Sequence, residues 1–247
     1  MADINPDKAV AMREGGRHLR AIKHELEKFS TVGRSFMEIE KEAMRLIHAC
    51  GADSNFDKVP GYHWATCINK NEGIVHGIPR DDVFVENGDL ISIDLGLLWQ
   101  GWNLDTSISF LVGDTDDATR YFLHAGEKAL EKAIHAARAG KTVYDISHQI
   151  EKSIVRAGFD PTWQLTGHYI GRQLHEDPYI PCVTDKRDRQ YVLHVGDTLA
   201  VEVMYAQGCC DLQEAADGWT YETKDGSLTA LFENTILITP DGPEVLT

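Results

Sequence analysis

The stretch Ile91-Ser92-Ile93-Asp94-Leu95, followed by Asn103-Leu104-Asp105-Thr106-Ser107, decides how this chain is expected to fold. Both segments carry strand signals, and a tight turn near Trp99-Gln100-Gly101 would pair them as an antiparallel hairpin. Depending on which two residues form the turn, Asp94 and Asp105 become direct partners or diagonal neighbours. Either register places the two carboxylates on the same face of the sheet, within reach of one another.

Two carboxylates on an otherwise buried strand face would repel each other and lose their hydration. A cation bound between Asp94 and Asp105 removes both problems, so the hairpin points to a metal site. The alternative is that one of the two aspartates lies exposed at the edge of the sheet.

Three more polar residues interrupt apolar or glycine-rich runs downstream: His168 within residues 166–171, Glu202 within 199–204 and Glu233 within 231–238. Any one of them alone is more often a hydrogen-bonded core residue than a ligand. Together with the two aspartates they are enough to hold two divalent ions. Oxygen-rich donors favour Mn²⁺, Fe²⁺ or Co²⁺ at least as much as Zn²⁺, and a pair of ions can lower the pKa of a shared water.

The helices are expected in two similar pairs. The first pair covers residues 6–29, with Val10, Leu19, Ile22 and Leu26 on one face, and residues 35–51, which open with the capping box Ser35-Phe36-Met37-Glu38. The second pair covers residues 117–139 and a helix that starts at Thr142. The pattern recurs 107 positions later, and the matches include Gly33 with Gly140, Ser35 with Thr142, and Gly51 with Gly158. We interpret this as a two-fold internal repeat of helix–helix–strands, the alternative being a chance likeness of two capped helices.

Strand signals lie at residues 66–68, 73–76, 90–98, 105–112, 199–205 and 228–239. No linker rich in proline or serine separates the two halves. Residues 1–247 are therefore expected to form a single α+β domain, with helices packed outside a curved, mostly antiparallel sheet.

The composition favours a cytoplasmic protein. The chain has 247 residues, a formal net charge of −15 and a polar start, Met1–Pro6, without the features of a secretory signal. No apolar run approaches the ~18 residues that span a bilayer, and an acidic chain is not expected to bind nucleic acid directly.

Several motifs together resemble the pita-bread-fold metallopeptidases and, within them, the type I methionine aminopeptidases. That fold has two pseudo-symmetric halves, in agreement with the repeat. The matching stretches are Gly61–His63, Cys67–Pro79, the Asp94/Asp105 hairpin, Gly167–Pro178, and Asp217–Thr220 running through to Glu233–Thr235.

The resemblance implies a metal centre with two divalent ions. Asp94 would bind one ion, His168 and Glu202 would bind the other, and Asp105 and Glu233 would bridge them. Glu202 is also the expected proton shuttle for a water that bridges the ions. The implied reaction is hydrolysis that removes the N-terminal methionine from nascent proteins and peptides.

The resemblance also assigns residues to the substrate. His76 and His175 match two histidines that do not bind metal but contact the substrate and stabilise the developing oxyanion. The methionine pocket would be built from Tyr62, His63, Cys67, Leu174 and Trp219. A monomer is expected, and a transient contact with the ribosome stays open.

Two alternatives remain at this level: a proline-directed or broad-specificity aminopeptidase on the same fold, and a pita-bread module that binds without catalysis. Glu202 and Glu233 are 31 positions apart, which leaves no room for the helical insertion of type II enzymes. The chain departs from the family pattern without losing a ligand, and the pocket shape is where these departures are expected to act. They are Tyr169, Val203, Leu231 and Asn234.

Overall fold

The hairpin that carries the two aspartates forms as predicted. The computed structural model, which describes residues 4–247, shows β4 (Leu90–Trp99) and β5 (Trp102–Leu111) joined by the turn Gln100-Gly101. Both turn residues have positive φ, 50° and 78°, the geometry that matches the twist of a two-residue hairpin. Trp99 pairs with Trp102, so Asp94 stands opposite Ser107 and the two aspartates are diagonal neighbours.

The hairpin belongs to a ten-stranded sheet in which every pairing is antiparallel. Besides β4 and β5, the strands are β1 (Asp53–Ser54), β2 (Thr66–Lys70), β3 (Gly73–Val75), β6 (Asp160–Pro161), β7 (Thr166–Tyr169), β8 (Glu176–Pro181), β9 (Thr198–Ala206), β10 (Leu212–Glu214), β11 (Tyr221–Thr223), β12 (Thr229–Thr239) and β13 (Gly242–Val245). The order along the main path of the large sheet is β1-β4-β5-β12-β9-β7-β8, with β2 on β4, β6 on β9 and β13 on β12. A small second sheet has the order β10-β11-β3.

Both predicted helix pairs are present: α1 (Pro6–Phe29) with α2 (Phe36–Ala49), and α3 (Asp117–Ala136) with α4 (Val143–Ala157). Two details differ from expectation. Val10 is exposed, and the buried face of α1 includes Met12 and Lys23. α3 ends three residues early, because Ala137 leaves the helical conformation with ψ of 79°.

The internal repeat is visible in three dimensions. The capping boxes of α2 and α4 correspond, since the Glu38 and Asp145 carboxylates accept from the backbone N–H of Ser35 and Thr142 at 2.8 Å. β1 pairs with β4 as β6 pairs with β9, and β2 pairs with β4 as β7 pairs with β9. The central strand β12 joins the halves because it pairs with both β5 and β9.

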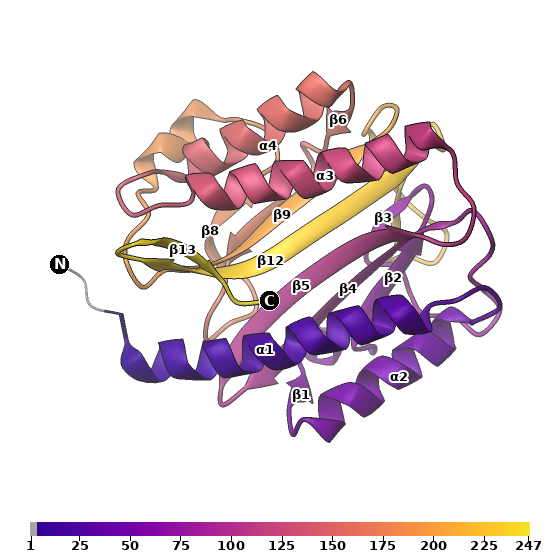
Figure 1. The fold of residues 1–247 in the computed structure, drawn as a ribbon, viewed down its shortest axis with the longest axis horizontal. Coiled ribbons are helices and arrows are strands. Elements are labelled where there is room, and N and C mark those ends of the chain that lie inside the picture. Colours follow the sequence, from indigo (N-terminus) through magenta and orange to yellow (C-terminus); the bar gives the residue numbers. More distant parts are fainter. Residues whose placement is uncertain (1–3) are drawn as a thin grey trace.

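The helices leave the opposite face of the sheet free for a site. α1 packs on β4 and β5, α3 packs on β9 and β12, and both pairs lie on one face (Figure 1). Gly16 lets α1 lie close to the C-terminal segment, since a Cβ at this position would stand 2.6 Å from the carbonyl oxygen of Leu246. Ile93 and Leu95 pack against α1, so Asp94 between them faces the other way.

Two hydrophobic clusters fill the space under the helices, each built mainly but not entirely from one half of the chain. Among residues 4–247, no helix is long and apolar enough to cross a membrane. Of the polar start noted above, Met1, Ala2 and Asp3 lie outside the described residues.

Candidate metal centre and substrate cavity

The five predicted ligands come together from five strands: Asp94 on β4, Asp105 on β5, His168 on β7, Glu202 on β9 and Glu233 on β12. Glu202 and Glu233 are direct cross-strand partners. All five line one cavity of about 350 Å³ on the face of the sheet away from the helices.

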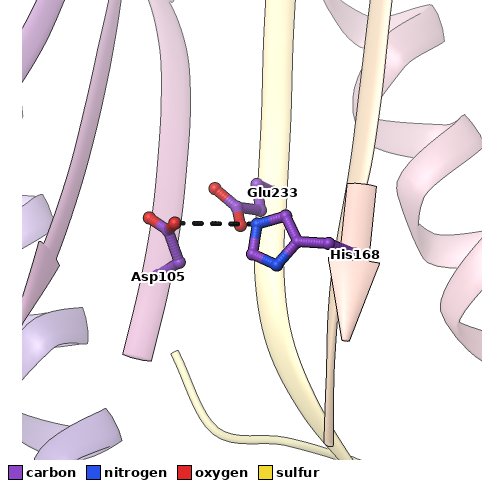
Figure 2. Close-up of side chains that lie close together, drawn as sticks. All are labelled: Asp105, His168 and Glu233. Atoms are coloured by element: carbon purple, nitrogen blue, oxygen red, sulfur yellow. Dashed lines mark ion pairs between the residues drawn. The ribbon is translucent and has the colours of Figure 1, made fainter. Parts of the chain in front are cut away.

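The distances within this group suit a metal centre. Asp105, His168 and Glu233 each offer a ligand atom within 4.8 Å of the others, and Figure 2 shows their side chains converging. The Nε2 atom of His168 lies 3.9 Å from Asp105 Oδ2 and 3.6 Å from Glu202 Oε1. Its Nδ1 atom lies 2.9 Å from the backbone oxygen of Tyr169. That contact requires the proton on Nδ1, which leaves the lone pair of Nε2 directed at the carboxylates.

Burial of four carboxylates in one cavity perturbs their acidity strongly. It raises the pKa of Asp94 to about 7. The pKa of Asp105 is raised well above its usual range, first by burial and then by the charges of Glu233 and Asp94. Burial and neighbouring carboxylates also raise the pKa of Glu202 and Glu233. The four groups cannot all be ionised cheaply without a compensating charge.

Two unpartnered atoms mark where a compensating cation would bind. Asp94 Oδ1 and Glu233 Oε1 are buried, and neither finds a hydrogen-bond partner within residues 4–247. Buried carboxylate oxygens normally have a partner, so these two atoms are free to act as metal ligands. Burial, together with the nearby His175, lowers the pKa of His168 to about 3, which keeps its ring neutral and able to ligate. The residues present therefore fit divalent ions.

A buried lysine approaches the same centre from the helix side of the sheet. Lys23 on α1 is 6 % exposed, and its Nζ atom donates to Thr106 Oγ1 at 2.7 Å. Thr106 in turn donates to the backbone oxygen of Glu233 at 2.9 Å. Burial lowers the pKa of Lys23 to about 8, and the charge of Glu233 opposes that shift. No feature of the sequence indicated this role, because a lysine in a surface helix normally extends its charge into water.

His76 and His175 stand at the accessible side of the cavity. Both have exposed side chains, yet both line it. The His175 ring meets the His168 ring edge-on, with centroids 4.5 Å apart, and His76 meets Tyr221 at 5.8 Å. Surrounding protein lowers the pKa of both histidines, and for His76 the charge of His175 adds to the effect.

Mostly apolar side chains, here called the apolar wall, line the cavity beside the predicted metal ligands. Tyr62 donates its hydroxyl to the backbone oxygens of Thr66 (2.8 Å) and Gly77 (3.1 Å), and its ring lies 5.1 Å from that of Trp219. Burial raises the pKa of the Cys67 thiol, so this side chain is an uncharged wall. Leu174 also lines the cavity.

His63, expected on the same wall, is instead exposed and outside the cavity lining. Its neighbour Tyr62 is turned inward by the two hydroxyl hydrogen bonds, and His63 follows on the outer side of the turn. Its ring lies 6.1 Å from that of Trp64.

Other residues of the cavity were not anticipated. Met204 follows Glu202 by two positions on β9, so the alternation of a strand would have placed it on the same face. For the rest, which lie mainly in loops and short strands, the sequence offered no regular pattern. They are Phe56, Val59, Val75, Gln164, Leu165, Thr166 and Tyr179.

The four departures from the family pattern lie away from the cavity. Val203 and Leu231 are buried in the core under the helices. Tyr169 donates its hydroxyl to Asp197 Oδ2 at 3.3 Å, and the side-chain amide of Asn234 donates to the backbone oxygen of Thr247. None of the four is part of the cavity lining within residues 4–247.

A larger hollow of about 990 Å³ lies elsewhere, where α3 and α4 meet the turn between β12 and β13. Its lining is rich in charged side chains, such as Lys132, Arg138 and Asp241, and contains none of the predicted site residues. The chemistry is therefore concentrated in the smaller cavity.

Comparison with known proteins finds a metallopeptidase family and several methionine aminopeptidases that are similar to this chain. The model of metallopeptidase family M24 matches residues 10–240. Methionine aminopeptidase 1 of Bacillus subtilis is 36% identical over 244 residues, which cover 98% of this chain and 97% of that protein. The crystal structure of methionine aminopeptidase from Thermotoga maritima superposes with a TM-score of 0.96 at 34% identity, covering 100% of this chain and 99% of the other. That from Rickettsia prowazekii gives 0.91 at 28% identity, with full coverage of both chains.

Proposed function

The chain belongs to metallopeptidase family M24, and on that premise we propose that it removes the N-terminal methionine from proteins and peptides by hydrolysis. One observation carries the proposal: a single cavity of about 350 Å³ is lined both by the five metal-ligand side chains and by apolar and thiol side chains. The similarity to methionine aminopeptidases over the whole chain supports it.

The metal centre would hold two divalent ions. Asp94 would bind one ion, His168 and Glu202 the other, and Asp105 and Glu233 would bridge them. Three of the five residues already place ligand atoms within 4.8 Å of one another. The donors are mainly oxygen atoms, which suits Mn²⁺, Fe²⁺ or Co²⁺ as well as Zn²⁺. When bound, such ions polarise the scissile carbonyl and make a water acidic enough to act as nucleophile near neutral pH.

The protein groups supply positioning and proton transfer. His76 and His175 are neutral at neutral pH because their pKa values are lowered, so each ring has one N–H to donate. We assign both to the oxyanion that forms as water adds to the carbonyl carbon. Glu202 takes the proton from that water and passes it to the amine nitrogen as the C–N bond breaks, which balances the hydrolysis.

The apolar wall explains a preference for methionine. An unbranched thioether side chain fills a slot of mixed aromatic and sulfur surfaces well. Tyr62, Cys67, Leu174 and Trp219 provide such surfaces, and the Tyr62 hydroxyl is already satisfied by backbone oxygens. A methylene that fits poorly costs only ~1–3 kcal/mol, so leucine should be accepted slowly and not refused.

The substrate class can be tested with four tripeptides at matched metal loading: Met-Ala-Ser, Leu-Ala-Ser, Met-Lys-Ser and Ala-Pro-Ser. We expect the highest kcat/KM for Met-Ala-Ser and slow cleavage of Leu-Ala-Ser. Met-Lys-Ser should be cut poorly, because its second side chain must pass close to the metal centre and His76. Fastest cleavage of Ala-Pro-Ser would support the proline-directed alternative. No cleavage with metal bound would support a binding module without catalysis.

Residues 1–247 would act as one catalytic domain. The ten-stranded sheet runs through both halves and the ligands come from both, which supports this arrangement. Newly made proteins that begin with methionine are the expected substrates, and a monomer suffices because all proposed catalytic groups lie on one chain.

A further inference from the structure

The loop that carries Leu174 and His175 is short. It joins β7, which ends at Tyr169, to β8, which begins at Glu176. Two contacts brace it from within: Gly171 N–H donates to the Gln173 oxygen at 3.0 Å, and Gln173 N–H donates to Glu176 Oε1 at 2.9 Å. Both contacts join residues of the loop and the start of β8, and neither reaches β4 or β5.

Asn103, which lies on β5 in the other half of the molecule, connects this loop to the β4–β5 hairpin. Its side-chain amide donates to the backbone oxygens of Gly171 (3.2 Å) and Arg172 (3.0 Å). Its backbone N–H also donates to Gly171 at 2.8 Å. Asn103 is only 6 % exposed, so water does not readily replace these bonds.

Arg172, which lies on the loop, makes further contacts with the β4–β5 hairpin. Its Nη1 atom donates to the backbone oxygen of Gly101 at 2.8 Å, and its guanidinium lies 3.7 Å from the centre of the Trp102 ring. Gly101 and Trp102 belong to the tip of the β4–β5 hairpin. The loop and the hairpin tip are therefore held together by hydrogen bonds and by the contact of the Arg172 guanidinium with the Trp102 ring.

The position of Asn103 on β5 makes the connection relevant to the site. Asn103 precedes Asp105 by two residues, so both side chains lie on the same face of one strand. The Oδ1 atom of Asn103 accepts from Asn55 Nδ2 at 3.3 Å, which turns the NH₂ end of the amide toward the loop. Strand β5 thus positions both Asp105, a predicted metal ligand, and the loop that bears His175.

We propose that Asn103 is a positioning residue for the reaction, which holds His175 at a fixed place relative to the metal centre. This rests on the proposed role of His175 as a donor to the oxyanion. Misplacement of such a group by about 1 Å can cost on the order of 10²-fold in rate. Loss of the Asn103 amide should therefore lower kcat while the metal ligands remain intact.

A double-mutant cycle with His175 tests the proposal. Asn103→Ala removes both side-chain donations. Asn103→Asp keeps the shape but sets a carboxylate against two carbonyl oxygens, and it serves as second variant if the alanine protein does not fold. Gln100→Asn is the control, since Gln100 lies at the same hairpin tip but bonds to Glu14 and not to the loop. Each change is made in the native protein and in His175→Ala.

The readouts are kcat and KM for Met-Ala-Ser, metal content of the purified protein, and melting temperature. We expect both Asn103 variants to lower kcat by about 10- to 100-fold with unchanged metal content, and by less than about twofold in the His175→Ala background. Gln100→Asn should leave kcat unchanged. An equal loss in both backgrounds, or no loss in either, would overturn the proposal. If His175→Ala alone does not lower kcat, the assignment of His175 fails first, and the two failures can be told apart.

Discussion

The buried carboxylates make a specific prediction for Asp94→Asn in the metal-free protein. Burial raises the pKa of Asp94 from its ordinary value of 3.8 to about 7. A pKa difference of about three units corresponds to about 4 kcal/mol in the free energy of unfolding. Because the folded pKa is raised, this group contributes most to stability below pH 4. The contribution is lost as pH rises toward 7.

Asparagine has the same shape but no charge, so the variant should escape that loss. With chelator present, Asp94→Asn should match the native protein at pH 4. At pH 8 it should be more stable by about 4 kcal/mol, or roughly 8–16 °C in melting temperature for a chain of this size. Excess divalent metal should reverse the order at pH 8, because only the native site gains stability from binding.

The measurement is thermal unfolding followed by intrinsic fluorescence at both pH values, with chelator and with metal. Asp81→Asn is the control, since this aspartate is exposed and lies 3.9 Å from Lys41. The Asp81→Asn substitution should change the melting temperature little at either pH. A gap between Asp94→Asn and native protein that is the same at pH 4 and pH 8 in chelator would refute the reasoning.

Four further changes probe the site and its support. Asp105→Asn should lower metal content from two ions, and full content with near-native turnover would contradict a bridging role. His76→Ala should lower kcat by about 10²–10³-fold with metal retained; loss of metal would instead make His76 a ligand. Lys23→Met removes a buried positive charge beside the centre and should tighten metal binding several-fold in calorimetry at pH 8, where weaker binding would count against it. Gly126→Ala places a Cβ 2.5 Å from the Tyr205 hydroxyl and should cost about 1–3 kcal/mol in denaturant unfolding.

The parts of the fold that could be predicted are those with strong local causes. The β4–β5 hairpin follows from two strand segments around a Gln-Gly turn, and α2 follows from its capping box. The lone charges in β9 and β12 marked ligands because an unpaired carboxylate in an apolar strand is costly. These causes act over a few residues and can be read without knowledge of the partner strands.

The parts that could not be predicted depend on distant contacts. β8 contains Pro178 and Pro181, which argue against a strand, and it is tolerated because it ends the main path of the sheet. β10 and β11 have three residues each, too few for a pattern. Helix periodicity places Lys23 on the buried face of α1, four residues after Leu19 and three before Leu26. Its charge made burial unexpected, and that burial depends on the packing of α1 against β5.

The place of β12 in the sheet has a consequence for synthesis of the protein. β12 lies in the middle of the sheet, yet it is formed by residues 229–239, which are synthesised after both β5 and β9. Until those residues emerge, β5 and β9 keep unpaired edges, and Glu233 is absent from the site. We expect chains arrested at residue 225 to remain protease-sensitive between the halves and to retain no metal, while chains arrested beyond residue 247 with a flexible extension become resistant. Equal resistance of the two would contradict this order. The proposed metal centre would thus be complete only after residues 229–239 have been made.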